Sequence, residues 1–575
     1  MSEDEDTIVL LKNVNCNTNS SILKPPLKEY PYISLKKLIK LSPINTKNLT
    51  PLTTENQNII VPIVAVLAGI SFGYDMGIGR QIAPLVKGEF VLDCKEESMI
   101  VNIWFIGCLL GALFGGILID QYGRRWTMIS TMVFLTFGSL LSALSNHYIL
   151  FLIARMICGY SGTVSAIAHC IYMSEISISN RRGCNITLHQ LGVASGLLLS
   201  VIATENKNLD YQWRLTIGLT AVSSMITCII TIIFLQRSPS FLLLKKVGNI
   251  KVSLNNSCCY VFEVLTIMII MLSLSQGTGR QQVLYYAPRL FALLGICTNI
   301  AKTTAMIALG IVRVFSTILC LIVIERCGRR TALITSATIC MISASLLSLL
   351  ATLDRGDELL NFSNESCNII INNNLKNELT NKIKSISLTD SSPFPLLPTP
   401  LAISVPNTEI WTQVKMSCET HNVITTDGLT TELKTLAVIT LLVFESAYTL
   451  GLGPVPLLTL NEIFPAVIRG KCIGFSIFIL WLIHILLFES IEKMTKMMTL
   501  AGTYLFYSFM CLITIFYVFL VYPETKGKSL NRIGQELRKI SIITRICNNV
   551  KSLPAISHIQ SIIKFKEKTN QSTPI

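Results

Sequence analysis

Asp120-Gln-Tyr-Gly-Arg-Arg125 and Glu325-Arg-Cys-Gly-Arg-Arg330 are two copies of one pattern of an acid, a glycine and paired arginines. Each copy directly follows a long apolar run. The glycine permits a tight turn between two helices, and the arginines can cap helix C-termini. Membrane topology alone explains a single arginine at a helix end, but not the ordered recurrence of the whole pattern. The pattern therefore predicts two copies of one helical unit.

A second pattern recurs in the same order, with Glu175 before Arg182 in the first unit and Glu462 before Arg469 in the second. A carboxylate and a guanidinium at such positions can pair across a gate between the two units. We expect this gate on the cytoplasmic side. Its predicted members are Arg124, Arg125, Glu175, Arg182, Glu325, Arg329, Arg330, Glu462, Arg469 and Glu524.

The apolar runs predict the fold class. A helix needs about 20 mostly apolar residues to cross a bilayer, and twelve such runs are bounded by charged or turn residues. They lie at about 59–79, 99–119, 126–144, 149–170, 187–204, 215–235, 259–279, 303–324, 332–353, 436–458, 472–488 and 500–521. We predict an all-α integral membrane protein of the major facilitator fold, with twelve transmembrane helices in two six-helix repeats.

The composition agrees with a membrane protein and argues against a soluble enzyme. Of 575 residues, 51% are hydrophobic and only 14% are charged. The chain has 48 Lys and Arg but only 34 Asp and Glu. Basic loops on one side of a membrane explain this excess of positive charge, rather than nucleic-acid binding. The 18 cysteines lack metal-ligand spacing, and no nucleophile–base pair or phosphate loop is present. We therefore expect no metal, no cofactor and no enzymatic activity.

The same runs predict how the chain is organised. We expect a disordered cytoplasmic tail at 1–58, a first half at 59–244, a short cytoplasmic linker at 245–258, a second half at 259–530 with an extracellular insertion at 354–434, and a cytoplasmic tail at 531–575. Basic residues concentrate in the even-numbered connections, which places both termini in the cytoplasm. The insertion carries glycosylation motifs at Asn361 and Asn364, and Cys367 and Cys418 could form a disulfide there.

Further motifs occur in a fixed order along the chain. They are Gly73-Tyr-Asp-Met-Gly77, Leu188-His-Gln-Leu-Gly192, Arg237-Ser-Pro-Ser-Phe-Leu-Leu243, Gln276-Gly-Thr-Gly279, Gly451-Leu-Gly-Pro-Val-Pro456 and Pro523-Glu-Thr-Lys-Gly527. With the repeated patterns they resemble the sugar porter family, the facilitated glucose transporters, from about residue 72 to 530. The long loop between the ninth and tenth spans most resembles the member 10 and member 12 subgroup. The resemblance implies a small-molecule sugar as cargo.

A sugar site needs side chains that donate and accept hydrogen bonds, with an aromatic face for the C–H surface of the ring. Polar or amphipathic residues within apolar spans are candidates, because an unpartnered amide in hydrocarbon is unfavourable. They are Gln190, Gln276, Thr278, Gln281, Tyr285, Tyr286, Trp481 and His484. By resemblance, Gln190 and Gln276 bind sugar hydroxyls and Trp481 stacks on the ring.

The chain also departs from the family pattern. His484 stands where the family often has Asn, and Leu457 replaces a usual Trp. Arg313 lies in the middle of the eighth span, where an intramembrane charge indicates a functional group or an ion pair, and Glu445 is a candidate partner. Only about 15 residues connect the two halves, where the family has a bundle of short cytoplasmic helices.

Asp75 in the first span decides between passive transport and proton coupling. An ionised acid in hydrocarbon must be paired, hydrated or protonated, and Arg155 in the fourth span is the natural partner. Proton-coupled sugar porters resemble this chain in carrying Asp here, but a static structural pair would also explain it. We expect a hexose carrier that works by alternating access, in the plasma membrane or an endomembrane. A non-transporting sugar sensor and a carrier of dehydroascorbate or a polyol are the alternatives.

Overall fold

The computed structural model describes residues 54–177, 181–205, 212–236, 238, 258–292, 298–353, 431–465, 468–539, 544–546 and 549. Residues 245–257 of the predicted linker at 245–258 and most of the insertion, including Asn361, Asn364, Cys367 and Cys418, lie outside these residues. In the described part, twelve helical segments are long and apolar enough to span a membrane. Each coincides with one of the twelve predicted runs, so the predicted fold class is confirmed.

The described helices form two groups that follow each other in the chain. The first group comprises α2 (Thr54–Phe90), α3 (Cys94–Tyr122), α4 (Arg124–Leu144), α5 (Tyr148–Ile176), α6 (Arg182–Glu205) and α7 (Gln212–Phe234). The second comprises α9 (Cys258–Gln276), α10 (Arg280–Ala292), α11 (Thr298–Cys327), α12 (Arg329–Leu353), α16 (Thr431–Leu450), α17 (Pro454–Ile463) and α18 (Arg469–Leu520). The short helix α19 (Leu530–Lys539) follows and packs on α17.

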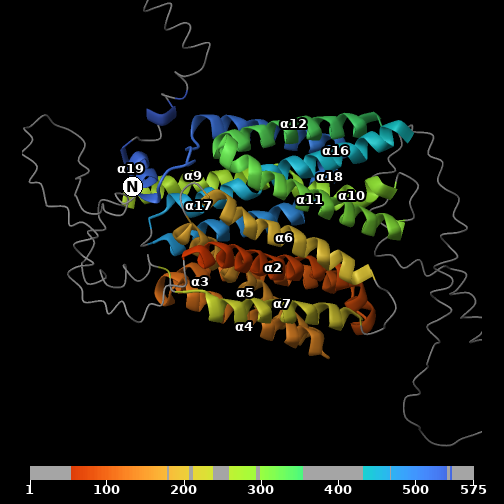
Figure 1. The fold of residues 1–575 in the computed structure, drawn as a ribbon. Helices are drawn as coiled ribbons and strands as arrows, with labels where there is room; N and C mark the ends of the chain where they lie inside the picture. The colour runs from red at the N-terminus through yellow and green to blue at the C-terminus, as the bar shows by residue number, and fades with distance from the viewer. Residues whose placement is uncertain are drawn as a thin grey trace, which may run out of the picture.

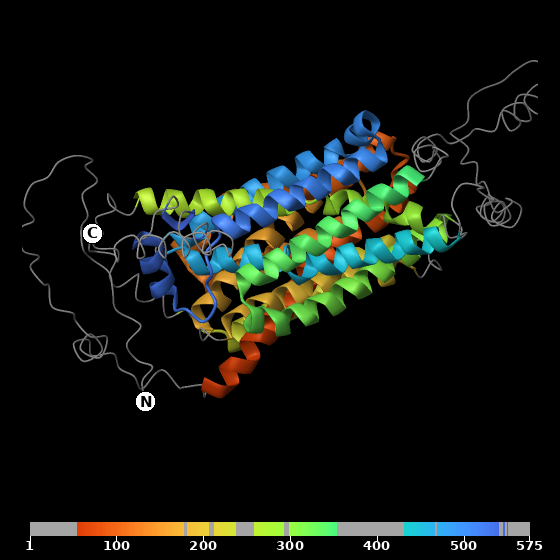
Figure 2. The ribbon, with the colours of Figure 1, turned by 90° about the horizontal axis from the view of Figure 1, so that it is seen from above.

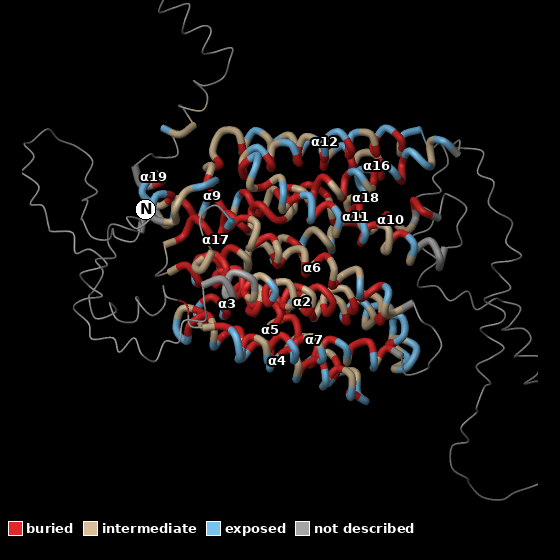
Figure 3. Tube along the Cα trace, in the orientation of Figure 1, coloured by how far each residue is buried: buried red, intermediate tan, exposed pale blue. Residues whose placement is uncertain are grey.

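The two groups lie side by side as two layers of roughly parallel helices, which are separated by colour in Figure 1 and run lengthwise in Figure 2. They meet where α18 packs on α3 and where α11 packs on α6. Buried residues gather on the inner faces of the helices, as Figure 3 shows. Large apolar side chains such as Phe134, Leu215 and Phe516 remain more than half exposed on the outside, where a bilayer would cover them.

Two of the spans are interrupted, and both interruptions border the space between the layers. The seventh span changes from α9 to α10 at Gly277–Gly279, and the tenth changes from α16 to α17 at Gly451–Gly453. Gly279 has φ 85°, and a Cβ at this position would lie 2.2 Å from the Tyr507 ring. Only glycine therefore fits this turn. A broken helix inside a membrane needs a protein-lined or wet surrounding, which the space between the layers supplies.

Two spans extend far beyond their predicted ends, by more than ten residues each. The predicted first run stops at residue 79, but α2 continues through Arg80 to Phe90. The predicted seventh run stops at residue 279, but the chain continues as α10 from Arg280. Apolar-run counting ends a span at a charged residue, so it placed both arginines at a boundary. In the structure each arginine lies within a span, facing the space between the layers.

Candidate functional site

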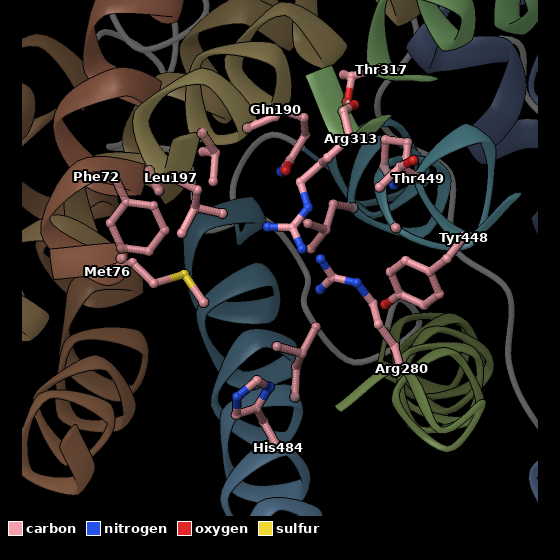
Figure 4. Close-up of a pocket in the computed structure, with 18 of the residues that line it drawn as sticks. Phe72, Met76, Gln190, Leu197, Arg280, Arg313, Thr317, Tyr448, Thr449 and His484 are labelled. Carbon is pink, nitrogen blue, oxygen red and sulfur yellow. The ribbon is translucent and has the colours of Figure 1, made fainter. Parts of the chain in front are cut away.

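A cavity of about 310 Å³ lies between the two layers and is lined by residues of both. Of the predicted sugar-binding residues, five line it: Gln190, Gln276, Gln281, Trp481 and His484. Figure 4 shows Gln190 from α6 directed toward the same space as Arg280 and Arg313, with His484 of α18 at its edge. Amide groups from α6, α9 and α10 therefore converge on one volume, as hydrogen bonding to a polyhydroxy ligand requires.

The structure does not bring Thr278, Tyr285 and Tyr286 to the cavity. Thr278 turns back on its own helix and donates from Oγ1 to the Ser275 carbonyl at 2.8 Å. Tyr286 donates its hydroxyl to Thr495 Oγ1 at 3.0 Å, and Tyr285 packs edge-on against the Tyr286 ring. Thr278 therefore bonds back to the end of α9, Tyr286 joins α10 to α18, and none of the three predicted residues lines the cavity.

An aromatic wall closes one side of the cavity. Trp481 lies 5.8 Å from Phe105 and 5.3 Å from His484, measured between ring centroids. Gln281 Nε2 and His484 Nδ1 are hydrogen-bonded at 2.8 Å, which joins α10 to α18. The wall thus combines an apolar face with fixed polar groups, and this is the combination that a sugar ring needs.

Asp75 is buried behind this wall rather than in it. Its Oδ1 is 2.7 Å from Arg155 Nη1, and its Oδ2 accepts a hydrogen bond of 2.6 Å from Trp104 Nε1. Arg155 Nη2 also donates to the Asp75 carbonyl at 3.0 Å. The predicted pair is therefore in contact. The Trp104 ring meets Trp481 edge-on at 5.9 Å, so one indole separates the ion pair from the cavity wall.

Three arginines of the described residues line the cavity, and only Arg313 is among the residues predicted from the sequence. Arg313 is 2.7 Å from Glu445 through Nη2, and Arg280 is 2.9 Å from the same Glu445 oxygen. Arg80 of α2 lies with its guanidinium 5.2 Å from the Phe488 ring centroid. Arg80 and Arg280 were missed because each stands at the apparent end of an apolar run. The signal that could have found them is a charge directly after an apolar run, with further helix-forming residues behind it.

The repeated acid and arginine patterns meet at one end of the bundle, on the same side as α17 and α19 (Figure 1). In the first half, Glu175 Oε1 is 3.0 Å from Arg124 and accepts the Ser238 hydroxyl through its other oxygen. In the second half, Glu462 is 3.2 Å from Arg329 and accepts the Thr525 hydroxyl at 2.6 Å. The two halves repeat one arrangement.

Bonds between the halves close this end. Arg469 of the second half is 3.2 Å from Glu175 of the first. Asp120 accepts the backbone N–H groups of Gly470 and Lys471, and Glu325 accepts that of Cys184 at 3.0 Å. Each acid of the six-residue pattern therefore binds the start of a helix in the opposite half, where a negative charge is favourable.

The remaining predicted gate residues satisfy backbone groups. Arg125 donates to the Ile232 carbonyl at 2.8 Å near the end of α7, and Arg330 donates to the Phe519 carbonyl near the end of α18. Glu524 accepts the backbone N–H groups of Arg329 and Arg330. Arg182 donates to the Lys528 carbonyl at 3.4 Å, which also crosses between the halves.

No group of three or more His, Cys, Asp or Glu able to hold a metal is present among the residues that the structure describes. A two-repeat helical bundle with a central cavity, lined by amide, aromatic and guanidinium side chains among apolar ones, and with ion pairs at one end is typical of a secondary transporter of the major facilitator type. The chain matches the family described as "Sugar (and other) transporter" over residues 61–250, 248–361 and 410–537, and it belongs to that family.

Individual relatives agree with this assignment. The chain is 29% identical to solute carrier family 2, facilitated glucose transporter member 12, of Mus musculus, over 85% of this chain and 86% of the relative. It is 24% identical to member 10 of Xenopus tropicalis, over 85% and 94%. Among solved structures, the proton:xylose symporter XylE bound to 6-bromo-6-deoxy-D-glucose shares the fold, with TM-score 0.61, 19% identity, and coverage of 84% of this chain and 100% of that one.

Proposed function

We propose that this chain carries a hexose across a membrane by alternating access. The observation that supports this most directly is the cavity between the halves, where three amides and a Trp–His wall surround a volume of about 310 Å³. Its relatives named as facilitated glucose transporters favour the same cargo class. The volume suits one small ligand rather than a polymer.

Each feature of the site has a part in the proposed cycle. Gln190, Gln276 and Gln281 bind hydroxyl groups, and Trp481 covers the apolar face of the ring. When the gate is closed, as here, the Glu175–Arg469 ion pair and the backbone bonds accepted by Asp120 and Glu325 hold the halves together at one end. Rocking of the halves would break these contacts and expose the cavity to that side.

We further propose that the gate faces the cytoplasm and that both termini lie there, following the distribution of basic residues. The insertion at 354–434 is then outside the cell or in an organelle lumen, where Asn361 and Asn364 could be glycosylated. Treatment of the expressed protein with an N-glycosidase should reduce its apparent mass, and an Asn361→Gln, Asn364→Gln double variant should show no reduction.

The transport function is tested with the purified full-length chain in proteoliposomes. We expect uptake of labelled D-glucose, and faster uptake when the vesicles are preloaded with unlabelled glucose, because a carrier exchanges its cargo in each cycle. A sugar sensor would bind glucose without exchange. Binding without any exchange would therefore contradict the proposal and favour the sensor. Competition of dehydroascorbate and of polyols with labelled glucose for uptake then ranks the remaining candidate cargoes.

A further inference from the structure

The charges in the cavity do not balance. Arg80, Arg280 and Arg313 all line it, whereas none of the described lining residues is an acid. Glu445 lies directly behind the lining and is fully buried against Arg280 and Arg313. Three guanidinium groups against one carboxylate leave two positive charges. A neutral hexose would leave them uncompensated inside the membrane, which is unfavourable.

The ion pairs with Glu445 do not use all the donors of its partners. Arg280 binds Glu445 through Nε and Nη2, and Arg313 also binds it through Nε and Nη2. In the described part of the chain, neither Nη1 atom donates a hydrogen bond. Figure 4 shows the two guanidinium groups facing each other in the centre of the cavity. Donors therefore remain available to a ligand at this point.

Arg80 adds a third guanidinium from the opposite half. No carboxylate of the described residues lies within ion-pair distance of it, and its contact is the Phe488 ring. The charges of Arg280 and Arg313 both act on Arg80, so the three groups repel one another across the cavity. An anion among them would remove this repulsion and would join α2 of the first half to α10 and α11 of the second.

We propose that the cavity takes a sugar that bears a carboxylate, a hexuronate, whose carboxylate binds among Arg80, Arg280 and Arg313. Guanidinium groups match the two oxygens of a carboxylate in geometry as well as charge. The hydroxyl groups of the same ring would bind the neutral amides of Gln190, Gln276 and Gln281. This proposal rests on the proposed transport function and narrows its cargo class.

The test compares D-glucuronate with its uncharged methyl ester, which has the same ring and hydroxyl groups. Binding to the purified full-length chain is followed by tryptophan fluorescence, since Trp481 lines the cavity. We expect the parent protein to prefer glucuronate over the ester by about tenfold or more, as for a hydrogen bond to a charged group. Arg80→Gln should abolish most of this preference, and Arg80→Lys should restore part of it.

Lys87→Gln is the matched control, because it removes one positive charge from the same helix outside the cavity, where Lys87 pairs with Glu97 at 2.9 Å. Its glucuronate preference should equal that of the parent. Equal binding of glucuronate and the ester by the parent would overturn the proposal, as would an unchanged preference in Arg80→Gln. If chloride strengthened glucose binding and the parent showed no preference for glucuronate, the surplus positive charge would be balanced by an inorganic ion. This result would also overturn the hexuronate proposal.

Uptake of glucose in proteoliposomes separates this proposal from the transport function. Parent protein that exchanges glucose but shows no preference for glucuronate keeps the function and loses the anion site. Parent protein that prefers glucuronate but exchanges neither sugar keeps the anion site and contradicts transport.

Discussion

At the residue scale, two amides from opposite halves define how a sugar would be held. Gln190 of α6 and Gln276 of α9 both line the cavity. Gln190→Ala and Gln276→Ala should each weaken hexose uptake about fivefold in affinity, because one hydrogen bond to cargo contributes on the order of 1 kcal/mol. The measurement is the concentration dependence of glucose uptake at equal surface abundance.

Thr266→Ala is the control for the two amide variants. Thr266 lies on α9 like Gln276, but it faces outward and bonds only to its own helix, at the Phe262 carbonyl. Its uptake kinetics should match those of the parent. Amide variants that behaved like Thr266→Ala would remove both glutamines from the site.

Residue chemistry could be predicted from the sequence where a polar group interrupts an apolar run. Gln190, Gln276 and Trp481 were selected in this way, and the structure places them on the cavity. Arg80 and Arg280 could not be found by the same reasoning, since a charge after twenty apolar residues is also the usual end of a span. The sequence also does not predict the direction in which a side chain points. Tyr286, which was predicted to bind sugar, faces Thr495 instead of the cavity.

At the scale of the element, the turn between α9 and α10 directs Arg280 and Gln281 into the cavity. Gly279→Ala should severely destabilise the protein, because a Cβ would meet the Tyr507 ring at 2.2 Å and φ 85° is strained for alanine. Thermal unfolding in detergent measures this. Gly277→Ala in the same turn is the control, since its nearest atom lies at 3.3 Å and its φ is ordinary. Equal stability of the two variants would contradict this explanation of the turn.

The gate is also a property of elements, since it joins the ends of α5 and α17 to the starts of α12 and α18. Arg329 is held by Glu462 and also pairs at 3.4 Å with Glu325, the acid that accepts the Cys184 N–H of the first half. Glu462→Gln should therefore loosen this contact between the halves and shift the protein toward the state open on the gate side. Labelling by a maleimide reports this. Cys184 is half-buried in the gate and should react several times faster in the variant, whereas the exposed Cys327 should not change.

Glu432→Gln supplies the matched control for the gate variant, because Glu432 is exposed at the opposite end of the same span. Its labelling should equal that of the parent. Cys184 labelling that is identical in Glu462→Gln and the parent would show that this ion pair does not set the conformational balance.

At the scale of the whole molecule, the repeat makes the fold predictable from the sequence. It does not predict which side chains of the two halves meet at the cavity. The six-residue patterns at Asp120 and Glu325 fix the order of helices in each half, and their contacts repeat in the structure. The apolar runs set the number of spans, but the way the two halves face each other depends on packing between residues hundreds of positions apart. The surplus of positive charge in the cavity arises from that facing, with Arg80 on one half and Arg313 on the other.

Proton coupling through Asp75 would require a link between a buried carboxylate and a cavity that it does not line. Asp75 does not line the cavity, and it reaches the wall only through Trp104, which contacts both the carboxylate and Trp481. Protonation of Asp75 would weaken its bonds to Arg155 and Trp104, and the Trp104 ring could then move against Trp481, which lines the cavity. Sugar binding and proton binding would thereby affect each other.

Asp75→Asn should therefore abolish the stimulation of glucose uptake by an inward proton gradient, while passive glucose exchange remains measurable. The readout is uptake into proteoliposomes with and without the gradient, for the parent, Asp75→Asn and Asp93→Asn. Asp93 is an exposed residue at the start of α3, and its variant should respond to the gradient like the parent. A parent that ignores the gradient would make Asp75 and Arg155 a structural pair in a passive carrier. Loss of passive exchange in Asp75→Asn would also assign a structural role to the pair, because the carboxylate would then be needed to hold α2 against α5 in every step of the cycle.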